Sequence, residues 1–249
     1  YSTSHYYNYP IISKAISWLS VLSLLLTALL VSNNPVPFSI VLNNTFIHDT
    51  LTANAKIIVL VFAALCLMTA SNYVRGQRIN SFEYYILTLF SMLGVILLIA
   101  SYDLISAYLA IELQSLALYV MASFKKDSAF STEAGLKYFI LGAFSSGLLL
   151  FGSTLVYGFT GTTNFEDLAR LLSNTSSLDA NVFGVNAILV GITFISAGML
   201  FKLAAAPFHM WSPDVYEGAP TSTTAIFAIV PKIAVFILFY RLFQHSFYN

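Results

Sequence analysis

The segment FKLAAAPFHMWSPDVYEGAP, residues 201–220, interrupts a long apolar run with a lysine, prolines, a histidine and two acids. A continuous helix over residues 183–213 would rise roughly 46 Å, well beyond a hydrocarbon core of about 30 Å. Pro207 cannot donate to the helix ladder, so we expect the helix to break there, with Lys202 in its last turn. Carbonyl groups freed at membrane depth must be satisfied by protein or by a water-filled cavity.

Outside this segment the composition is that of a membrane protein. Of the 249 residues, 58% are hydrophobic and only 9% are charged, whereas soluble domains carry about 25% charged residues. The apolar runs are long and continuous, which favours helices over the short alternating strands of a barrel. We therefore predict an all-α integral membrane protein.

Seven segments approach the length needed to span a bilayer. They lie at about 15–31, 55–73, 82–101, 103–123, 132–158, 183–208 and 219–243. Residues 33–46 and 160–182 are the long polar links, and FEDLARLL within the second predicts a short amphipathic helix at the interface. Seven spans would place the two ends on opposite sides of the membrane.

Several function classes are excluded by what the sequence lacks. Basic and acidic residues balance at 11 each without a run of like charge, so nucleic acid is not an expected partner. Cys66 is the only cysteine, and no Cys/His cluster has metal-binding spacing. Nucleotide-binding and covalent-catalysis motifs are also missing. We expect no metal, cofactor or redox chemistry in this chain, and infer that its chemistry is the movement of charge.

The fourth predicted helix carries a carboxyl group at its centre. An ionisable side chain inside a span costs at least a few kcal/mol, so it is a functional candidate by default. At 100° per residue, Glu112 shares one face with Tyr108, Ser115 and Tyr119. This polar stripe predicts a hydrated contact surface; the alternative is a neutral or paired packing residue.

Two lysines join Glu112 as candidates. Lys202 lies beside the predicted break, although a lysine there could also extend its ammonium to the interface. Lys232 is central in the last helix, where reaching the interface is hardest, and Pro231 beside it loosens one backbone hydrogen bond. If Glu112 lies beside Lys202, their pairing keeps the proton on the lysine, and separation releases it toward Lys232.

Lys137 and His209 are weaker candidates. Glu133 precedes Lys137 by four residues, which equally predicts an ordinary helix salt bridge. His209 could relay a proton near neutral pH or serve as an interfacial structural residue. Asp214 and Glu217 are expected to lie in water or to pair with a neighbouring subunit.

At these residues the chain resembles a known family. The segments AYLAIELQSLALYVMASFKK, STEAGLKYFILGAFSSGLLLFG and FKLAAAPFHMWSPDVYEGAPTSTTAIFAIVPKIAVF are similar to subunit 2 of respiratory complex I, NADH:ubiquinone oxidoreductase, over roughly residues 80–245. That family implies two inverted repeats of five helices, each with a broken helix. Residues 82–245 would be the first antiporter-like repeat, and residues 1–81 an N-terminal segment with two transmembrane helices.

The resemblance also implies roles for the buried charges. Glu112 stands at the motif glutamate, Lys202 at the broken-helix lysine that gates an input half-channel, Lys232 at the connecting lysine and Lys137 at an additional lysine. The implied function is proton translocation in the membrane arm. NADH, FMN, iron–sulfur clusters and ubiquinone would be bound by other subunits.

The chain departs from the family pattern because it contains one repeat. We expect a separate polypeptide to carry the second repeat, and processing to explain the start at Tyr1. Expected partners are the other membrane-arm subunits and membrane lipids, in the mitochondrial inner membrane or, alternatively, a bacterial plasma membrane. The competing hypotheses are a structural half-antiporter without pumping and a free-standing cation/proton antiporter.

Overall fold

A computed structural model describes residues 10–76, 82–173 and 182–247, and within these ranges seven helices are long and apolar enough to cross a membrane. They are α1 (Pro10–Ser32), α2 (Thr50–Gly76), α3 (Phe82–Ala100), α4 (Leu104–Ala122), α5 (Ala129–Thr160), α7 (Val182–Leu203) and α9 (Thr221–Arg241). The seven predicted spans and the all-α class are thus confirmed, with ends that differ by a few residues.

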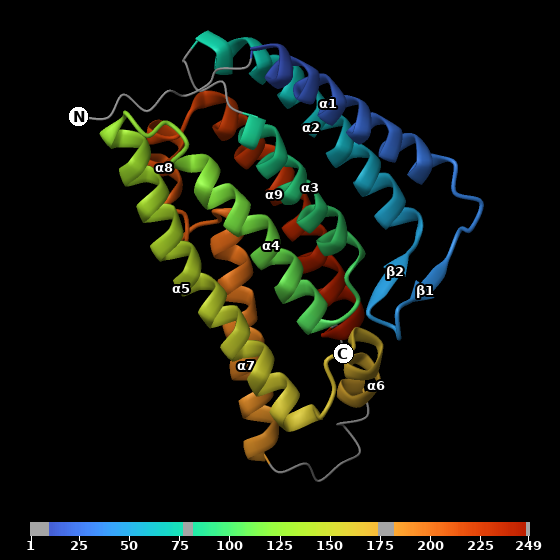
Figure 1. The fold of residues 1–249 in the computed structure, drawn as a ribbon. Coiled ribbons are helices and arrows are strands. Elements are labelled where there is room, and N and C mark those ends of the chain that lie inside the picture. The colour runs from blue at the N-terminus through green and yellow to red at the C-terminus, as the bar shows by residue number, and fades with distance from the viewer. Residues whose placement is uncertain (1–9, 77–81, 174–181, 248–249) are drawn as a thin grey trace.

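The helices form a bundle with two flanks (Figure 1). α1 and α2 pack together on one flank, α5 and α7 on the other, and α3, α4 and α9 lie between them. The core between helices is apolar, and Val59, Val95 and Ile111 have no exposed surface. This arrangement places the polar stripe of α4 beside the flank that contains the helix break.

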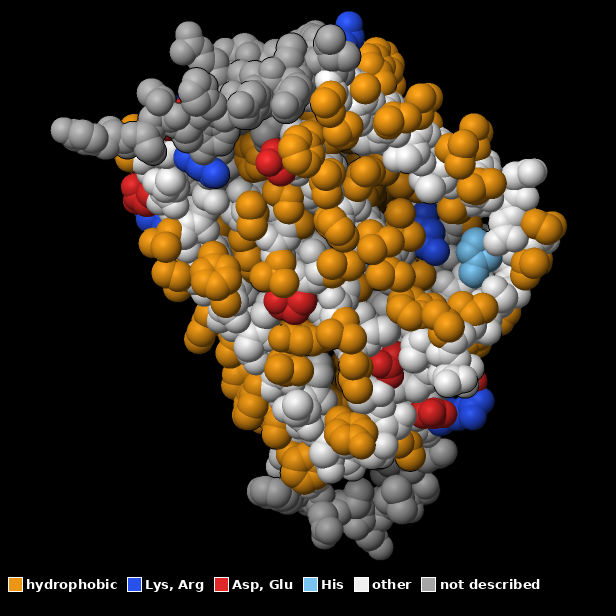
Figure 2. Space-filling model, viewed as in Figure 1, with side chains coloured by type: hydrophobic (Ala, Val, Ile, Leu, Met, Phe, Trp, Pro, Cys, Tyr) orange, Lys and Arg blue, Asp and Glu red, His pale blue; other side chains and the backbone are white. Residues whose placement is uncertain are grey.

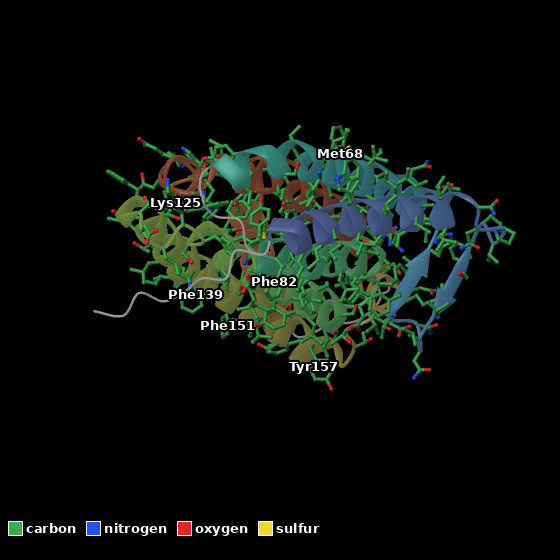
Figure 3. The ribbon with its side chains drawn as sticks, turned by 45° about the horizontal axis from the view of Figure 1, so that its top comes forward. Met68, Phe82, Lys125, Phe139, Phe151 and Tyr157 are labelled. Atoms are coloured by element: carbon green, nitrogen blue, oxygen red, sulfur yellow. The ribbon has the colours of Figure 1, made fainter. Side chains whose placement is uncertain are left out.

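The face of the bundle drawn in Figure 2 carries many exposed apolar side chains. Phe139, Phe151 and Tyr157 project outward from α5 (Figure 3), and each is about half exposed. Exposed apolar surface on this scale is not stable in water but is the expected surface of a protein within a bilayer or against neighbouring membrane subunits.

Both polar links contain short elements. The predicted amphipathic helix is present as α6 (Phe165–Ser173), and the polar link at 33–46 contains structure that the sequence did not predict. It contains an antiparallel hairpin of β1 (Ser39–Val41) and β2 (Phe46–His48), whose turn residues Leu42 to Asn44 have positive φ angles of 54° to 64°. Three-residue strands are too short to show a period-two pattern in sequence.

The predicted discontinuity is confirmed, with one correction. α7 ends at Leu203, not at residue 208, because the chain already leaves the helix at Ala204, whose φ is +56°. A link over residues 204–211 follows, and the short helix α8 (Ser212–Gly218) then leads into α9. Lys202 is therefore in the last turn of α7, as expected.

Glycines bring α5 and α7 into close contact. A Cβ atom on Gly152 would lie 2.6 Å from the Gly191 carbonyl oxygen, and one on Gly198 would lie 2.9 Å from Leu149 Cβ. Such distances are below normal contact, so only glycine permits this approach. This close contact fixes α7, and hence Lys202, against α5.

Candidate functional site

Lys202 is buried and has a neutral partner. Its residue is only 8% exposed, and its Nζ donates a hydrogen bond of 3.1 Å to the hydroxyl oxygen of Tyr119 on α4. The same Nζ lies 5.7 Å from the centre of the Tyr119 ring. The site therefore contains a buried cation whose direct contact is a phenol, which provides an acceptor but no neutralising charge.

The break beside Lys202 is satisfied by protein. The Phe201 carbonyl oxygen accepts hydrogen bonds from the Trp211 indole at 2.9 Å and from the Ala204 backbone N–H at 3.0 Å. Trp211 is buried and stacks on Tyr138 of α5, with ring centres 4.8 Å apart. The freed backbone at membrane depth thus obtains the partners that the absence of bulk water requires.

Glu112 does not form the predicted ion pair with Lys202. Among the described residues, no lysine nitrogen lies within 4.0 Å of its carboxylate, and its buried Oε1 has no hydrogen-bond partner. Glu112 nevertheless interacts electrostatically with both Lys202 and Tyr119. The two charges predicted to work together are in one site but are separated in this structure.

The polar stripe of α4 is covered by protein. Ser115 and Tyr119 are buried, and the Tyr119 ring makes edge contacts with Tyr138 and Phe139 of α5 at 4.8 and 5.6 Å. This part of the stripe is therefore a contact surface against α5, as predicted, and its hydration stays a prediction.

Lys232 occupies a second, similar site. It is partly buried in α9, and its Nζ lies 5.4 Å from the centre of the Tyr216 ring. The Tyr216 hydroxyl is buried without a hydrogen-bond partner among the described residues. Pro231 is accommodated inside α9 without ending the helix.

A row of aromatic rings connects the two lysines. It runs from Tyr119 to Tyr138 at 4.8 Å, on to Trp211 at 4.8 Å, and then to Tyr216 at 5.9 Å. Lys202 lies at one end of this row and Lys232 at the other. Both cations thus face aromatic rings, the arrangement of a cation–π contact.

Lys137 is an ion-paired residue near one end of α5. Its Nζ contacts Glu133 Oε1 at 2.8 Å and Asp214 Oδ2 at 2.7 Å. The salt bridge to Glu133, one of the two readings of their spacing, is present. Asp214 is exposed, as one of the two alternatives for it predicted, and it also pairs within the chain, where it ties α8 to α5. The Lys137 side chain is 41% exposed, so it is not the buried charge that the sequence suggested.

His209 and Glu217 are not brought into the buried site. His209 is exposed in the 204–211 link, and Glu217 is exposed in α8. No hydrogen bond joins either side chain to Lys202 or Glu112 among the described contacts. A relay through His209 stays a prediction.

Sequence reasoning missed a second buried cation. Arg241, at the end of α9, is 3% exposed, and its guanidinium donates to both carboxylate oxygens of Asp49 at 3.1 and 2.9 Å. Asp49 lies just before α2, outside the span. Burial alone would raise its pKa, but the Thr52 backbone N–H and the Arg241 charge outweigh burial and hold the pKa below its ordinary value. The sequence did indicate Arg241 as a candidate, because it is an ionisable residue within a predicted span.

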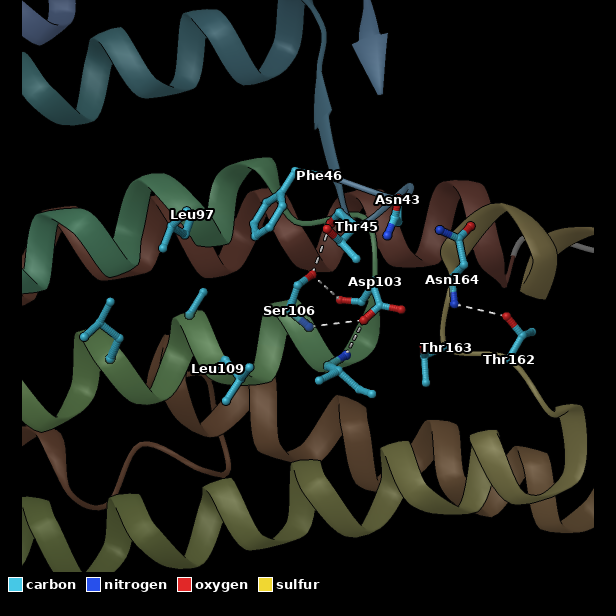
Figure 4. A pocket seen from close by; sticks show the side chains of 13 residues that line it. Asn43, Thr45, Phe46, Leu97, Asp103, Ser106, Leu109, Thr162, Thr163 and Asn164 are labelled. Carbon is cyan, nitrogen blue, oxygen red and sulfur yellow. Dashed lines mark hydrogen bonds between the residues drawn. The ribbon is translucent and has the colours of Figure 1, made fainter. Parts of the chain in front are cut away.

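A separate cavity of about 670 Å³ lies at the other end of α4 (Figure 4). The hairpin turn, the start of α4 and the α5–α6 link surround it, and Asp103 in its wall caps α4 by accepting from the N–H groups of Ile105 and Ser106. None of the predicted site residues lines it. In the described part of the chain, no group of three His, Cys, Asp or Glu residues could hold a metal.

Comparison with known proteins identifies the family. Residues 101–249, which include the α4 stripe and the helix break, match the model described as NADH:quinone oxidoreductase/Mrp antiporter, TM. The chain belongs to this family. The match begins inside the proposed repeat 82–245 and does not test its boundary with the N-terminal segment.

Relatives come from plants and bacteria. The chain is 48% identical to NADH-ubiquinone oxidoreductase chain 2 of Marchantia polymorpha, over 100% of this chain and 51% of the relative. It is 43% identical to NADH-quinone oxidoreductase subunit N of Maricaulis maris, over 94% of this chain and 47% of the relative. The chain spans about half the length of these curated relatives.

Solved structures share the fold. A chain of respiratory complex I from Thermus thermophilus matches with a TM-score of 0.73 and 28% identity, over 92% of this chain and 48% of the other. A chain of the Mrp complex from Dietzia sp. matches with a TM-score of 0.72 at 22% identity, over 95% of this chain and 44% of the other, and shows the fold alone. The protein is thus an antiporter-like, multi-pass membrane protein.

Proposed function

We propose that this chain is a proton-translocating part of the membrane arm of NADH:ubiquinone oxidoreductase, corresponding to one half of subunit 2. The observation that carries the proposal is Lys202: a buried cation at a helix break, bonded to a neutral phenol, with Glu112 unpaired in the same site. A buried charge without a neutralising contact is expensive, and its retention in a membrane span favours a functional role.

The proposed mechanism depends on how far Lys202 is from a negative charge. Pairing with Glu112 would hold a proton on Lys202, and separation would favour its release because a buried ammonium is poorly solvated. The structure has the separated arrangement, with Lys202 on Tyr119. The row of aromatic rings leads from there to Lys232, which we propose as the next proton acceptor.

The energy source and remaining components are proposed to lie on other chains. Moving one charge against 100 mV costs about 2.3 kcal/mol, and no residue pattern in this chain provides that energy. The names of the relatives contain NADH and quinone, and we propose that these, with FMN and iron–sulfur clusters, are bound by other subunits. We propose a companion polypeptide with the second repeat, neighbouring antiporter-like subunits and bound lipids as partners. The plant relatives favour the mitochondrial inner membrane; a bacterial plasma membrane is the alternative.

A structural half-antiporter is the rival role. It would gain stability by losing Glu112, Lys202 and Lys232, so their presence inside the spans argues against it. A free-standing antiporter has support only from the shared fold of the Mrp complex chain. The assembly and pumping experiments that follow test both of these alternatives.

The first experiment asks what the chain assembles with. The tagged chain would be purified in mild detergent, run on a native gel stained for NADH dehydrogenase activity, and its co-migrating polypeptides identified by mass spectrometry. We expect the stained band to contain the chain and a second polypeptide with the missing repeat. Migration as a small unstained species would contradict membership in the complex.

The second experiment tests pumping. Lys202→Met and Glu112→Gln, in the assembled complex in sealed vesicles, should lower the number of protons pumped per electron while assembly is retained. Lys126→Met, which removes an exposed lysine, is the matched control. Unchanged proton-to-electron ratios in both variants would favour the structural role.

A further inference from the structure

We propose that Tyr119 is a positioning residue that holds Lys202 away from Glu112, so that Lys202 alternates between two partners on one face of α4. The inference rests on the proposed function, because it assigns a task to a residue of the same proton path. Its basis is the hydrogen bond between Lys202 Nζ and the Tyr119 hydroxyl, together with the unpaired Glu112 carboxylate in the same site.

The two partners are placed along the helix. Glu112 and Tyr119 are seven residues apart, close to two full turns, so they share a face and are separated by roughly 10 Å along the axis. Lysine has a flexible four-carbon stem, and in a helix its side chain is directed toward the N-terminal end. From the last turn of α7, Lys202 therefore extends back into the bundle, and its flexible stem allows the ammonium to change direction.

Tyr119 is the fixed member of the pair. Its ring is held by edge contacts with Tyr138 and Phe139, and its hydroxyl lies against the backbone at Gly142 of α5. A Cβ atom at Gly142 would clash with the hydroxyl and lie 2.7 Å from Cζ of the ring. The absence of a side chain at this position is what allows the hydroxyl to meet Lys202.

Both arrangements leave one group incompletely satisfied. With Lys202 on Tyr119, the ammonium has an acceptor but no counter-charge, and the Glu112 Oε1 atom is buried without a hydrogen bond. With Lys202 on Glu112, the charges would be paired and the Tyr119 hydroxyl would lose the hydrogen bond from Lys202. Neither partner satisfies the whole site, which is the condition for a two-position switch. Removing the hydroxyl should leave Glu112 as the dominant partner.

The decisive variant is Tyr119→Phe in the assembled complex, because it removes the hydroxyl and keeps the ring contacts. We expect normal assembly and a proton-to-electron ratio that falls to the value of Lys202→Met, since Lys202 is then held on Glu112. Infrared spectroscopy provides the second readout: the carboxylate band of Glu112, assigned by its loss in Glu112→Gln, should shift in Tyr119→Phe.

Gly142→Ala tests the position of the Tyr119 hydroxyl by changing the residue that it packs against on α5. Its Cβ would displace the Tyr119 hydroxyl and should shift the Glu112 band in the same direction as Tyr119→Phe. Gly147→Ala on the same helix is the matched control, because its Cβ would meet nothing within 4 Å. If Gly147→Ala shifted the Glu112 band as much as Gly142→Ala, the positioning role of Tyr119 would be overturned.

The outcomes separate the inference from the function on which it rests. If Lys202→Met and Glu112→Gln lower the pumping ratio while Tyr119→Phe changes neither the ratio nor the Glu112 band, the positioning role is wrong and the proposed function stands. If none of the three variants changes the ratio, the proposed function itself fails. A lower ratio in Tyr119→Phe without a band shift would mean a packing role only, and would also overturn the inference.

Discussion

Two buried cations in this bundle are held in different ways. Arg241 is 3% exposed and contacts both oxygens of the Asp49 carboxylate at 2.9 and 3.1 Å, whereas Lys202 is 8% exposed and contacts a neutral hydroxyl at 3.1 Å. The Arg241 pair joins the end of α9 to the residue before α2. Both contacts come from one guanidinium nitrogen, Nη2, and their acceptor is a carboxylate, so the Arg241 charge is neutralised where it lies. A lysine on a phenol leaves the charge free to change partner.

The largest effect is expected from breaking the Arg241 pair. Asp49→Asn would leave a buried guanidinium without its counter-charge, which costs about 3–5 kcal/mol when the pair is fully buried and less when it is partly exposed. The Asp49 side chain is 28% exposed, so we expect a loss of roughly 2–4 kcal/mol. The measurement is thermal unfolding of the purified protein in detergent, and Asp167→Asn, on the exposed side of α6, is the control. Equal melting temperatures for the two variants would contradict the comparison.

The next effect is the pH dependence of the same pair. The folded-state pKa of Asp49 is lowered from 3.8, so the pair's stabilisation is complete above that value and is lost as the pH falls through the folded-state pKa. The difference in melting temperature between the natural protein and Asp49→Asn should be constant at neutral pH and narrow only below about pH 4. A difference that already narrows near pH 6 would show that another group controls it.

Removing the neutral partner should cost less stability. Tyr119→Phe deletes one hydrogen bond to a buried ammonium but no opposite charge, so we expect a loss of about 1.5–3 kcal/mol in the same unfolding assay. The comparison requires this loss to be smaller than that of Asp49→Asn. A larger loss would mean that Tyr119 is as essential to the fold as the Arg241 pair.

The smallest effect is expected at Lys137. This lysine is partly exposed and has two carboxylate partners, so Asp214→Asn still leaves it paired with Glu133. Exposed ion pairs contribute little and are screened by salt. We expect a melting temperature within error of that of Glu217→Gln, a matched exposed variant on α8. A shift comparable to that of Asp49→Asn would place Lys137 with the essential pairs.

The sequence predicted what depends on local pattern. Span lengths follow from apolar runs, and the break before Pro207 follows from a helix too long for the bilayer. Lys202 and Glu112 were found because a charge inside a span is unusual in itself. Tyr119 was placed on the right face of α4, but as part of a hydrated stripe rather than as the partner of Lys202.

What could not be predicted depends on contacts between distant helices. Asp49 and Arg241 are 192 residues apart, and nothing in either local sequence identifies the other. The bond from Lys202 to Tyr119 requires the close approach of α5 at Gly142, which is set by packing. The same holds for Asp214, whose partner lies 77 residues away.

Trp211 also provides a fluorescence signal from the helix break. The chain contains two tryptophans, and they differ sharply: Trp211 is 3% exposed, stacked on Tyr138 and bonded to the Phe201 carbonyl, whereas Trp18 is 56% exposed on α1. With Trp18 replaced by phenylalanine, indole fluorescence would arise from the link next to Lys202 alone within this chain. Any rearrangement that pulls the indole from that carbonyl would alter its emission, so the chain carries its own optical reporter at the place where movement matters most.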